Sequence, residues 1–171
     1  MKTYVEPFEY AKEIMNARPG GVLLTTGDGE NANTMTIGWG ALAVEWYQPI
    51  FIAYVRDSRH TADLLKKTGE FTVNIPLNGD VKTITGYCGS HSGRDTDKFR
   101  DLGLTMVEGE TVKAPAIREL PLTLECKVIY VKEQPIADIA PASQTRFYSG
   151  KDEGNFHRAY YGRIEKAYIL D

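Results

Sequence analysis

Residues 33–40 (NTMTIGWG) combine polar, apolar and glycine positions in a pattern that suits contact with a flat aromatic ring. The segment predicts a strand, although Gly38 and Gly40 each weaken a strand by roughly 0.5–1 kcal/mol relative to alanine. Glycine inside a strand often marks a bulge or a ligand lying close to the backbone. Backbone N–H groups could donate to such a ring while Met35 and Trp39 supply apolar contact. A barrel corner with a buried tryptophan explains the same residues, and this segment alone favours that simpler interpretation.

Residues 56–61 (RDSRHT) join an apolar stretch to a predicted helix. Ser58 or Thr61 is expected to cap the N-terminus of that helix. Free N–H groups and the helix dipole favour an anion at such a position. Arg56 and Arg59 add positive charge, so this turn could hold a phosphomonoester. An ordinary capped turn with solvated arginines explains the residues equally well.

Residues 90–99 (SHSGRDTDKF) contain a lysine in an unfavourable place. Gly93 permits a tight loop, and Asp95 or Thr96 is expected to cap the helix that follows. Lys98 then falls in the first turn, where the helix dipole opposes a cation. A nearby anion would explain this position, whereas a solvated lysine is the simpler interpretation of that residue alone.

His157 stands at the entry to the last predicted strand. A lone histidine is usually structural or exposed, so its weight depends on the other segments. The sequence shows no Ser-His-Asp order, no metal-ligand spacing, and no Walker-type or Rossmann glycine loop. We therefore expect no catalytic side chain and no metal site. Cys88 and Cys126 belong to no paired motif, which indicates a reducing, cytoplasmic setting.

The bulk composition limits the partners. The chain has 171 residues, enough for one domain spanning residues 1–171. Its net charge of −3 provides no general attraction for nucleic acid, so we expect no nucleic-acid partner. Its apolar runs are far shorter than a membrane span, so we expect no membrane insertion.

The elements that must position these residues are mostly strands, expected over residues 22–26, 33–44, 50–56, 71–75, 120–132 and 159–170. The run 50–56 is almost continuously apolar and is expected to be buried on both faces. Short helices are expected over 8–16, 61–68 and 97–102, the first ended near Pro19 and the second by a left-handed Gly69. Closely spaced hairpins predict a mainly β fold, an antiparallel β-barrel with short helices filling its gaps. Residues 134–155 form a long irregular stretch that we expect to be a lid or a dimer arm.

Taken in order, these segments resemble the flavin reductase-like family, and its flavoredoxin-type members most of all. The resemblance covers about residues 18–164. Its most specific part is the run Ser92-Gly93-Arg94-Asp95-x-Asp97-Lys98-Phe99. Pieces that are weak singly but occur in the family's order are Asn33-x-Met35-Thr36 with Trp39, Arg56 with Thr61, Phe71-Thr72-Val73 and Leu120-Pro121-Leu122-x-Leu124-Glu125-Cys126.

The resemblance implies an FMN-binding split barrel that forms a homodimer with the flavin near the interface. It places the residues matching Asn33, Trp39, Thr61, Lys98 and His157 at the flavin, the strand of Thr36 under the ring, and the 56–61 turn at the phosphate. The cofactor-binding residues expected on this basis are Asn33, Met35, Thr36, Ile37, Gly38, Trp39, Arg56, Ser58, Arg59, Thr61, Lys98 and His157.

The implied function is that of an oxidoreductase, an NAD(P)H-dependent flavin reductase or a flavoredoxin. It would pass electrons from a reduced pyridine nucleotide or a redox protein to a flavin or a protein acceptor. Lys98 first and His157 second are the expected cations that favour the reduced flavin. Two alternatives stay open: a non-catalytic FMN-binding electron carrier, and an enzyme related to pyridoxamine-phosphate oxidase. The family's last-strand motif ends in an acidic residue where this chain has Arg163, which leaves donor and acceptor open.

Overall fold

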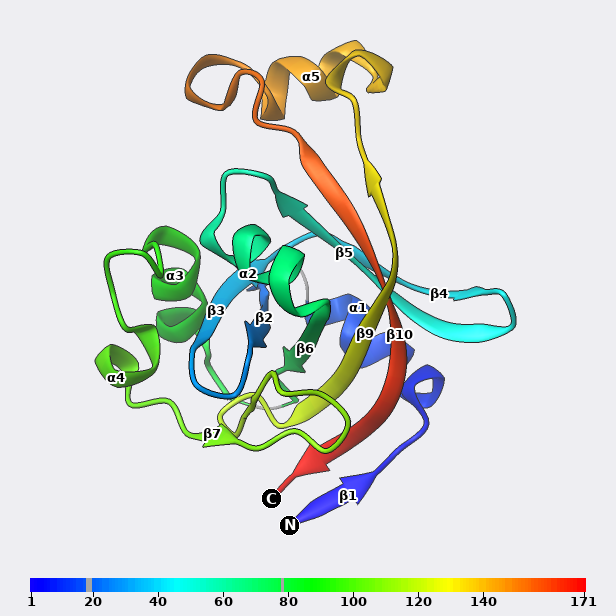
Figure 1. Ribbon diagram of the computed structural model, residues 1–171, viewed down its shortest axis with the longest axis vertical. Helices are drawn as coiled ribbons and strands as arrows, with labels where there is room; N and C mark the ends of the chain where they lie inside the picture. Colours follow the sequence, from blue (N-terminus) through cyan, green and yellow to red (C-terminus); the bar gives the residue numbers. More distant parts are fainter. Residues whose placement is uncertain (18–19, 78) are drawn as a thin grey trace.

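The computed structural model describes residues 1–17, 20–77 and 79–171, so the expected helix end at Pro19 lies outside the described residues. One antiparallel sheet dominates the molecule, with the strand order β3-β2-β6-β9-β10-β5-β4 and β1 paired to β10 (Figure 1). Its strands are β1 (Lys2–Tyr4), β2 (Val22–Gly27), β3 (Ala32–Ile37), β4 (Gly40–Glu45), β5 (Gln48–Arg56), β6 (Glu70–Ile75), β9 (Leu122–Glu133) and β10 (His157–Leu170). A small second sheet pairs β7 (Met106–Val107) with β8 (Ala116–Ile117).

The topology explains why the barrel is split. Strands β3 and β4 lie at opposite ends of the strand order, although only Gly38 and Trp39 separate them in the chain. The sheet must therefore curl until its two ends lie close together, although they do not pair. Among the described strands β3 pairs only with β2, so its outer edge keeps backbone groups that no strand ladder uses. The expected mainly β split barrel is confirmed.

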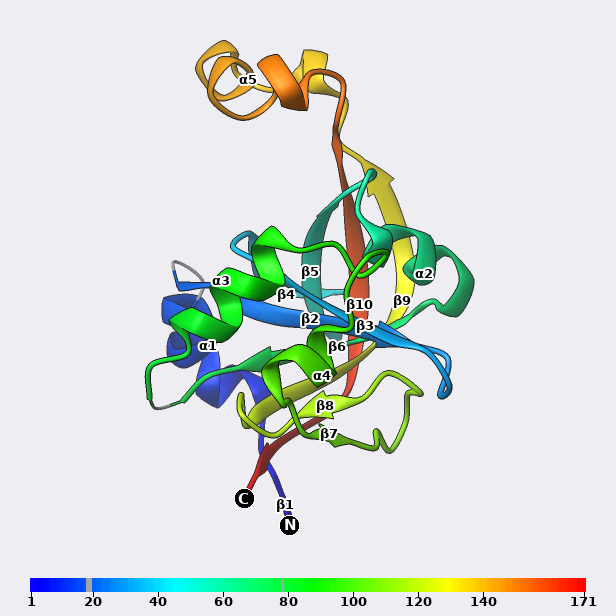
Figure 2. The ribbon, with the colours of Figure 1, turned by 90° about the vertical axis from the view of Figure 1, so that its left-hand side faces the viewer.

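Among the described residues, four short helices pack around this barrel (Figure 2). They are α1 (Ala11–Ala17), preceded by a 3-10 turn at Pro7–Tyr10, and α2 (His60–Thr68), α3 (Lys82–Ser90) and α4 (Lys98–Leu102). A fifth helix, α5 (Pro141–Phe147), lies away from the barrel. As expected, Gly69 ends α2 in the left-handed conformation, and Gly103 ends α4 in the same way, with φ of 63° at both.

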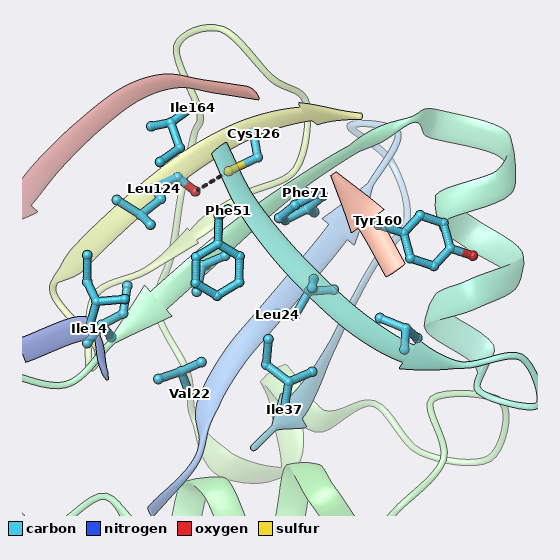
Figure 3. Packing of buried hydrophobic residues seen from close by; sticks show 14 of the residues in the cluster. Ile14, Val22, Leu24, Ile37, Phe51, Phe71, Leu124, Cys126, Tyr160 and Ile164 are labelled. Carbon is cyan, nitrogen blue, oxygen red and sulfur yellow. Dashed lines mark hydrogen bonds between the residues drawn. The ribbon is translucent and has the colours of Figure 1, made fainter. Parts of the chain in front are cut away.

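The main core lies inside the curled sheet, where Phe51, Phe71, Leu24 and Leu124 meet (Figure 3). Each fully buried side chain of this size contributes about 1.5–3 kcal/mol relative to an exposed one. Gly162 on β10 is required there, because a Cβ atom would clash with the Phe71 ring. This core holds β5 and β10 rigidly beside β3.

Strands β9 and β10 extend beyond the barrel and carry residues 134–155, which we call the arm (Figure 1). The arm contains α5 between two 3-10 turns, Ile136–Asp138 and Gly150–Asp152. The expectation of an irregular stretch missed this helix. Among the described residues, no helix is both long and apolar enough to cross a membrane.

Several local expectations were wrong. The strand expected over 33–44 is two strands, because the chain breaks at Gly38 and Trp39 and then pairs with β5. From Phe51 onward, β5 alternates buried and half-buried positions and is not buried on both faces. The apolar residues at alternate positions from Leu122 to Tyr130 predict a half-buried strand, but burial along β9 does not alternate: its first five residues are buried and its last five are exposed.

Both predicted helix caps also differ. Arg59 occupies the N-cap of α2 without a side-chain cap, and Ser58 and Thr61 do not cap it. Asp97 caps α4 by accepting from the Arg100 N–H at 3.1 Å, so neither Asp95 nor Thr96 is the cap.

Candidate functional site

A pocket of about 150 Å³, which we call the slit pocket, lies where the curled sheet fails to close. It is bounded by β3, the Gly38–Trp39 break, β5 and the start of β10. Because no described strand pairs with β3 on this side, its backbone edge borders the pocket. The lining residues are Met35, Thr36, Ile37, Gly38, Trp39, Tyr54, Arg56, Arg59 and His157.

A second pocket of about 170 Å³, the turn pocket, lies at the turn that leads into α2. It shares Met35, Thr36 and Arg59 with the slit pocket, so the two form one groove. Its lining residues are Asn33, Met35, Thr36, Ser58, Arg59, His60, Thr61, Cys88, Gly89, His91, Ser92, Gly93, Arg94 and Lys98.

The turn pocket is strongly cationic. Arg59, Arg94 and Lys98 line it, and no described aspartate or glutamate does. Arg94 is held in place by Asp63 and by the Ser58 carbonyl, to which it donates at 3.1 Å. Arg59 makes no side-chain hydrogen bond or ion pair with a described residue, so its charge is available to an anion. Burial and the Arg94 charge lower the pKa of His60, which therefore adds no charge at neutral pH.

The specific 92–99 run is built into the wall of this pocket. Gly93 packs directly on Asn33, and a Cβ atom at Gly93 would clash with Asn33 Oδ1. Asn33 Nδ2 donates to Thr61 Oγ1 at 2.8 Å, which ties β3 to α2. The run thus fixes β3, α2 and α4 together, and glycine is the residue that this close approach allows.

Lys98 is an unusual lysine, because only 3% of it is exposed. Its Nζ donates to the carbonyl oxygens of Thr34 at 2.8 Å and Cys88 at 3.1 Å. Among the described residues, no carboxylate pairs with it. Burial lowers its pKa. An ammonium has three protons, and these two bonds leave one for a ligand beside the pocket.

Arg56 serves the arm rather than the turn pocket. Its Nη1 donates to the Asn155 carbonyl at 2.9 Å and its Nη2 to the Phe147 carbonyl at 2.8 Å. Asp152 lies 3.7 Å from Nη1. The residue lines the slit pocket only, so the geometry does not favour its expected place at the phosphate.

The arm packs aromatic side chains against two residues that line the slit pocket, Trp39 and His157. Phe147 contacts Trp39 edge-on, and their ring centroids are 5.0 Å apart. The centroids of the His157 and Trp39 rings are 4.8 Å apart. The hydroxyl of Tyr148 is 2.7 Å from His157 Nδ1. Burial, followed by the Arg56 and Arg59 charges, lowers the pKa of His157 to about 4. His157 is therefore neutral at pH 7, and its expected role as a cation beside the flavin is not supported.

The structure brings all the predicted site residues into one groove, although they come from distant parts of the chain. Asn33, Ser58, Thr61 and Lys98 line the turn pocket, and Ile37, Gly38, Trp39, Arg56 and His157 line the slit pocket; Met35, Thr36 and Arg59 line both. The sequence analysis missed Tyr54, His60, Gly89 and the arm residues Phe147 and Tyr148. Arg94 lay within the specific run and could have been selected on its charge.

A larger cavity of about 920 Å³ lies behind the groove and has the opposite charge. Asn33, His60, Gly93 and Lys98 form a wall common to this cavity and the turn pocket. Its acidic lining residues are Glu30, Glu70, Asp97, Glu108 and Glu110, and we call it the acidic cavity.

Comparison with known proteins places these features in context. Residues 15–170 match the model of the flavin reductase like domain. Flavoredoxin of Desulfovibrio vulgaris is similar in structure, with a TM-score of 0.68 and 26% identity over 88% of this chain and 69% of that one. Flavoredoxin from Methanosarcina acetivorans has a TM-score of 0.67 and 30% identity over 88% of this chain and 68% of that one.

A curated relative, an uncharacterized protein of Archaeoglobus fulgidus, is 34% identical over 100 residues. These residues are 58% of this chain and 55% of the relative, so the chain spans little more than half of that protein's length.

Proposed function

Because the chain belongs to the flavin reductase-like family, we propose that its groove binds FMN and that the protein passes electrons between a donor and an acceptor. The donor would be NADH, NADPH or a redox protein, and the acceptor a flavin or a protein. The observation that carries the FMN proposal is the charge of the turn pocket. Arg59, Arg94 and Lys98 line it, and no described lining residue is a carboxylate, although Arg94 is paired with Asp63 beside the pocket. A phosphomonoester is the part of FMN that such a pocket suits.

The remaining residues fit the rest of the ligand. The free edge of β3 offers backbone groups to a flat ring, as the 33–40 pattern suggested. Trp39 and Met35 supply apolar surface at the slit pocket. Arg59 lines both pockets, so it lies between the slit pocket, which would hold the ring, and the turn pocket, which would hold the phosphate.

A bound flavin would supply the redox chemistry, and the protein would supply position and electrostatics. Lys98 places a desolvated positive charge at the groove, which favours the more negative, reduced state of such a group. Trp39 lines the slit pocket and contacts Phe147 of the arm, so this pair would limit access of water and of large acceptors to a bound ring. No side chain of the groove is needed as a general acid or base.

We also propose that the protein is a homodimer whose interface completes the site. The two pockets, about 170 and 150 Å³, together reach only the lower limit of typical ligand sites, which is roughly 300 Å³. A second subunit would close the open side. Exposed apolar side chains provide surface for such a contact: Trp46 in the turn between β4 and β5, and Tyr130 and Val131 on β9. Sedimentation analysis checks this: a monomer that holds FMN tightly would contradict the dimer.

The function is tested by titrating flavin-free protein with FMN and following the quenching of flavin fluorescence. We expect saturation at one FMN per chain and weaker binding of riboflavin. Anaerobic addition of NADH or NADPH then separates a reductase from the alternatives. Loss of the yellow colour supports a pyridine-nucleotide donor, whereas no bleaching favours the electron carrier. Failure to bind FMN would contradict the proposed function.

A further inference from the structure

Tyr148 and His157 form a buried hydrogen-bonded pair at the edge of the slit pocket. Tyr148 follows α5 in the arm, and His157 is the first residue of β10. Their exposed fractions are 7% and 6%, and the Tyr148 hydroxyl lies 2.7 Å from His157 Nδ1. No described residue bonds to the other ring nitrogen, Nε2, and the imidazole lines the slit pocket. The pair thus joins the arm to the groove.

The direction of this hydrogen bond follows from counting protons. The Tyr148 hydroxyl has Nδ1 as its only hydrogen-bond partner among the described residues. If Nδ1 carried the proton and donated, the phenol proton would have no acceptor in a buried place. The Nε2 proton of the other tautomer has no described partner either, but it belongs to a ring that lines the slit pocket, where water or a ligand can accept it. The phenol therefore donates to Nδ1, and the proton of the neutral imidazole is on Nε2.

The arm holds Tyr148 in the position that this bond needs. Arg56 Nη2 donates to the carbonyl of Phe147, the preceding residue, at 2.8 Å. The Arg56 guanidinium also lies over the Tyr148 ring, 5.2 Å from its centroid. The orientation of the phenol is thus fixed from two sides.

We propose that Tyr148 is a positioning residue that holds His157 as the neutral Nε2–H tautomer, so that Nε2–H donates to a carbonyl oxygen or ring nitrogen of the bound flavin. This inference rests on the proposed function for the identity of the acceptor, but not for the tautomer. The positive charges of Arg56 and Arg59 oppose a second proton on the ring, while Asp152 favours it weakly. Burial opposes the charged form as well, so the donor stays neutral across the physiological pH range.

The tautomer is tested on flavin-free protein by long-range ¹H–¹⁵N NMR of the histidine rings, with His157→Gln used to assign the signals. The wild type is expected to show the Nε2–H form of His157 at pH 7. Tyr148→Phe removes the donor to Nδ1 and is expected to give a mixture of tautomers and a higher His157 pKa. Tyr160→Phe is the matched control, because the Tyr160 hydroxyl is also buried but has no described partner. It should leave the His157 signals unchanged.

The consequence for the ligand is tested by FMN titration of the same variants. Tyr148→Phe should weaken FMN binding about tenfold, and Tyr160→Phe should not change it. In a His157→Gln background, where an amide supplies the donor without tautomers, Tyr148→Phe should have little further effect. A structural role of Tyr148 would instead weaken binding equally in both backgrounds.

The proposal is overturned if wild-type His157 carries its proton on Nδ1 or is charged at pH 7. It is also overturned if Tyr148→Phe leaves the tautomer unchanged, or if it weakens FMN no more than Tyr160→Phe does. Absence of FMN binding by the wild type contradicts the proposed function. The tautomer of His157 is still decided by the NMR measurement on flavin-free protein.

Discussion

The groove and the acidic cavity share a wall but differ in size and charge. The acidic cavity is about 920 Å³ and carries five lining carboxylates, whereas the turn pocket is about 170 Å³ and carries none among its described lining residues. Volume alone would select the acidic cavity as the ligand site. Charge selects the groove, because a phosphate dianion is attracted by Arg59, Arg94 and Lys98 and repelled by carboxylates. Lys98 lies on the wall common to the two pockets. We assign its charge to the turn pocket, because no described carboxylate lines that side.

The two regions also differ in what their polar residues do, and the largest effect is expected on the acidic side. Glu125 is fully buried and accepts from the N–H groups of Glu110 and Thr111 and from the hydroxyls of Thr111 and Tyr168. It therefore anchors the loop that lines the acidic cavity. Glu125→Gln removes the charge and replaces one accepting oxygen with an NH₂ group, which then faces the N–H and O–H donors that Glu125 served. The free energy of unfolding should fall by about 3 kcal/mol. Urea denaturation of the flavin-free protein measures this.

Glu30→Gln is the control for that loss, because Glu30 lines the same cavity with an exposed side chain. Its unfolding free energy should stay within about 0.5 kcal/mol of wild type. A small effect of Glu125→Gln would show that the loop does not depend on this carboxylate.

His157 gives the groove a pH dependence of stability. Its pKa is about 4 in the folded chain, below the ordinary value of 6.5, so the unfolded chain binds more protons between these values. The stability associated with the neutral ring is complete above about pH 6.5 and is lost as pH falls toward 4. From about pH 7.5 to about pH 5, wild type should lose about 2 kcal/mol more than His157→Gln.

Urea denaturation of both proteins at each pH measures how much stability each one loses. Groups that titrate alike in the two proteins cancel when the losses are subtracted. Arg56, Arg59 and Asp152 are the charged groups that face His157, and they are unchanged in the variant. Parallel pH curves for the two proteins would show that His157 titrates normally.

Arg59→Met tests the phosphate assignment by keeping the apolar stem and removing the charge. Charge-assisted hydrogen bonds contribute about 1.5–3 kcal/mol, so FMN affinity should fall at least tenfold. Riboflavin affinity should change much less, since it has no phosphate. Lys113→Met removes a cation from the acidic cavity and is expected to leave both affinities unchanged. Equal losses for FMN and riboflavin in Arg59→Met would place the phosphate elsewhere.

Lys98→Met is expected to lower the two-electron midpoint potential of bound FMN by about 30 mV, which corresponds to roughly 1.4 kcal/mol. The reason is that the reduced flavin, being more negative, gains more from the buried ammonium than the oxidised flavin does. Spectroelectrochemical titration at fixed pH and salt measures the shift, with Lys113→Met as the comparison. An unchanged or raised potential would mean that Lys98 serves only the Thr34 and Cys88 carbonyls.

The sequence could identify the groove because its chemistry is local and marked by unusual residues. Gly38, Trp39 and Gly40 indicated a bulge or a barrel corner, although the division of residues 33–44 into two strands was not predicted. The Lys98 position indicated a charge that a surface helix would not favour. Helix α3 escaped prediction because Lys82–Ser90 contains Gly86, Gly89 and a β-branched run, which disfavour an isolated helix. Tertiary packing compensates, since Thr36 donates to the Thr85 carbonyl at 2.6 Å and Gly89 lets α3 approach β3 closely.

The contribution of the arm could not be predicted for a different reason. Nothing in residues 134–155 indicates that Phe147 and Tyr148 turn back to Trp39 and His157. That contact depends on Arg56, which donates to the Phe147 carbonyl although the two residues are 91 positions apart in the sequence. Likewise, the neutrality of His157 arises from burial and from two arginines that only the fold brings near it.

The most direct test of the account is a crystal structure of the protein with FMN bound. We expect the phosphate in the turn pocket, in contact with Arg59 and Thr61, and the ring along β3 beside Lys98 and His157. FMN with its phosphate in the acidic cavity, or bound away from both, would contradict the central claim that charge and the open edge of β3 define the site.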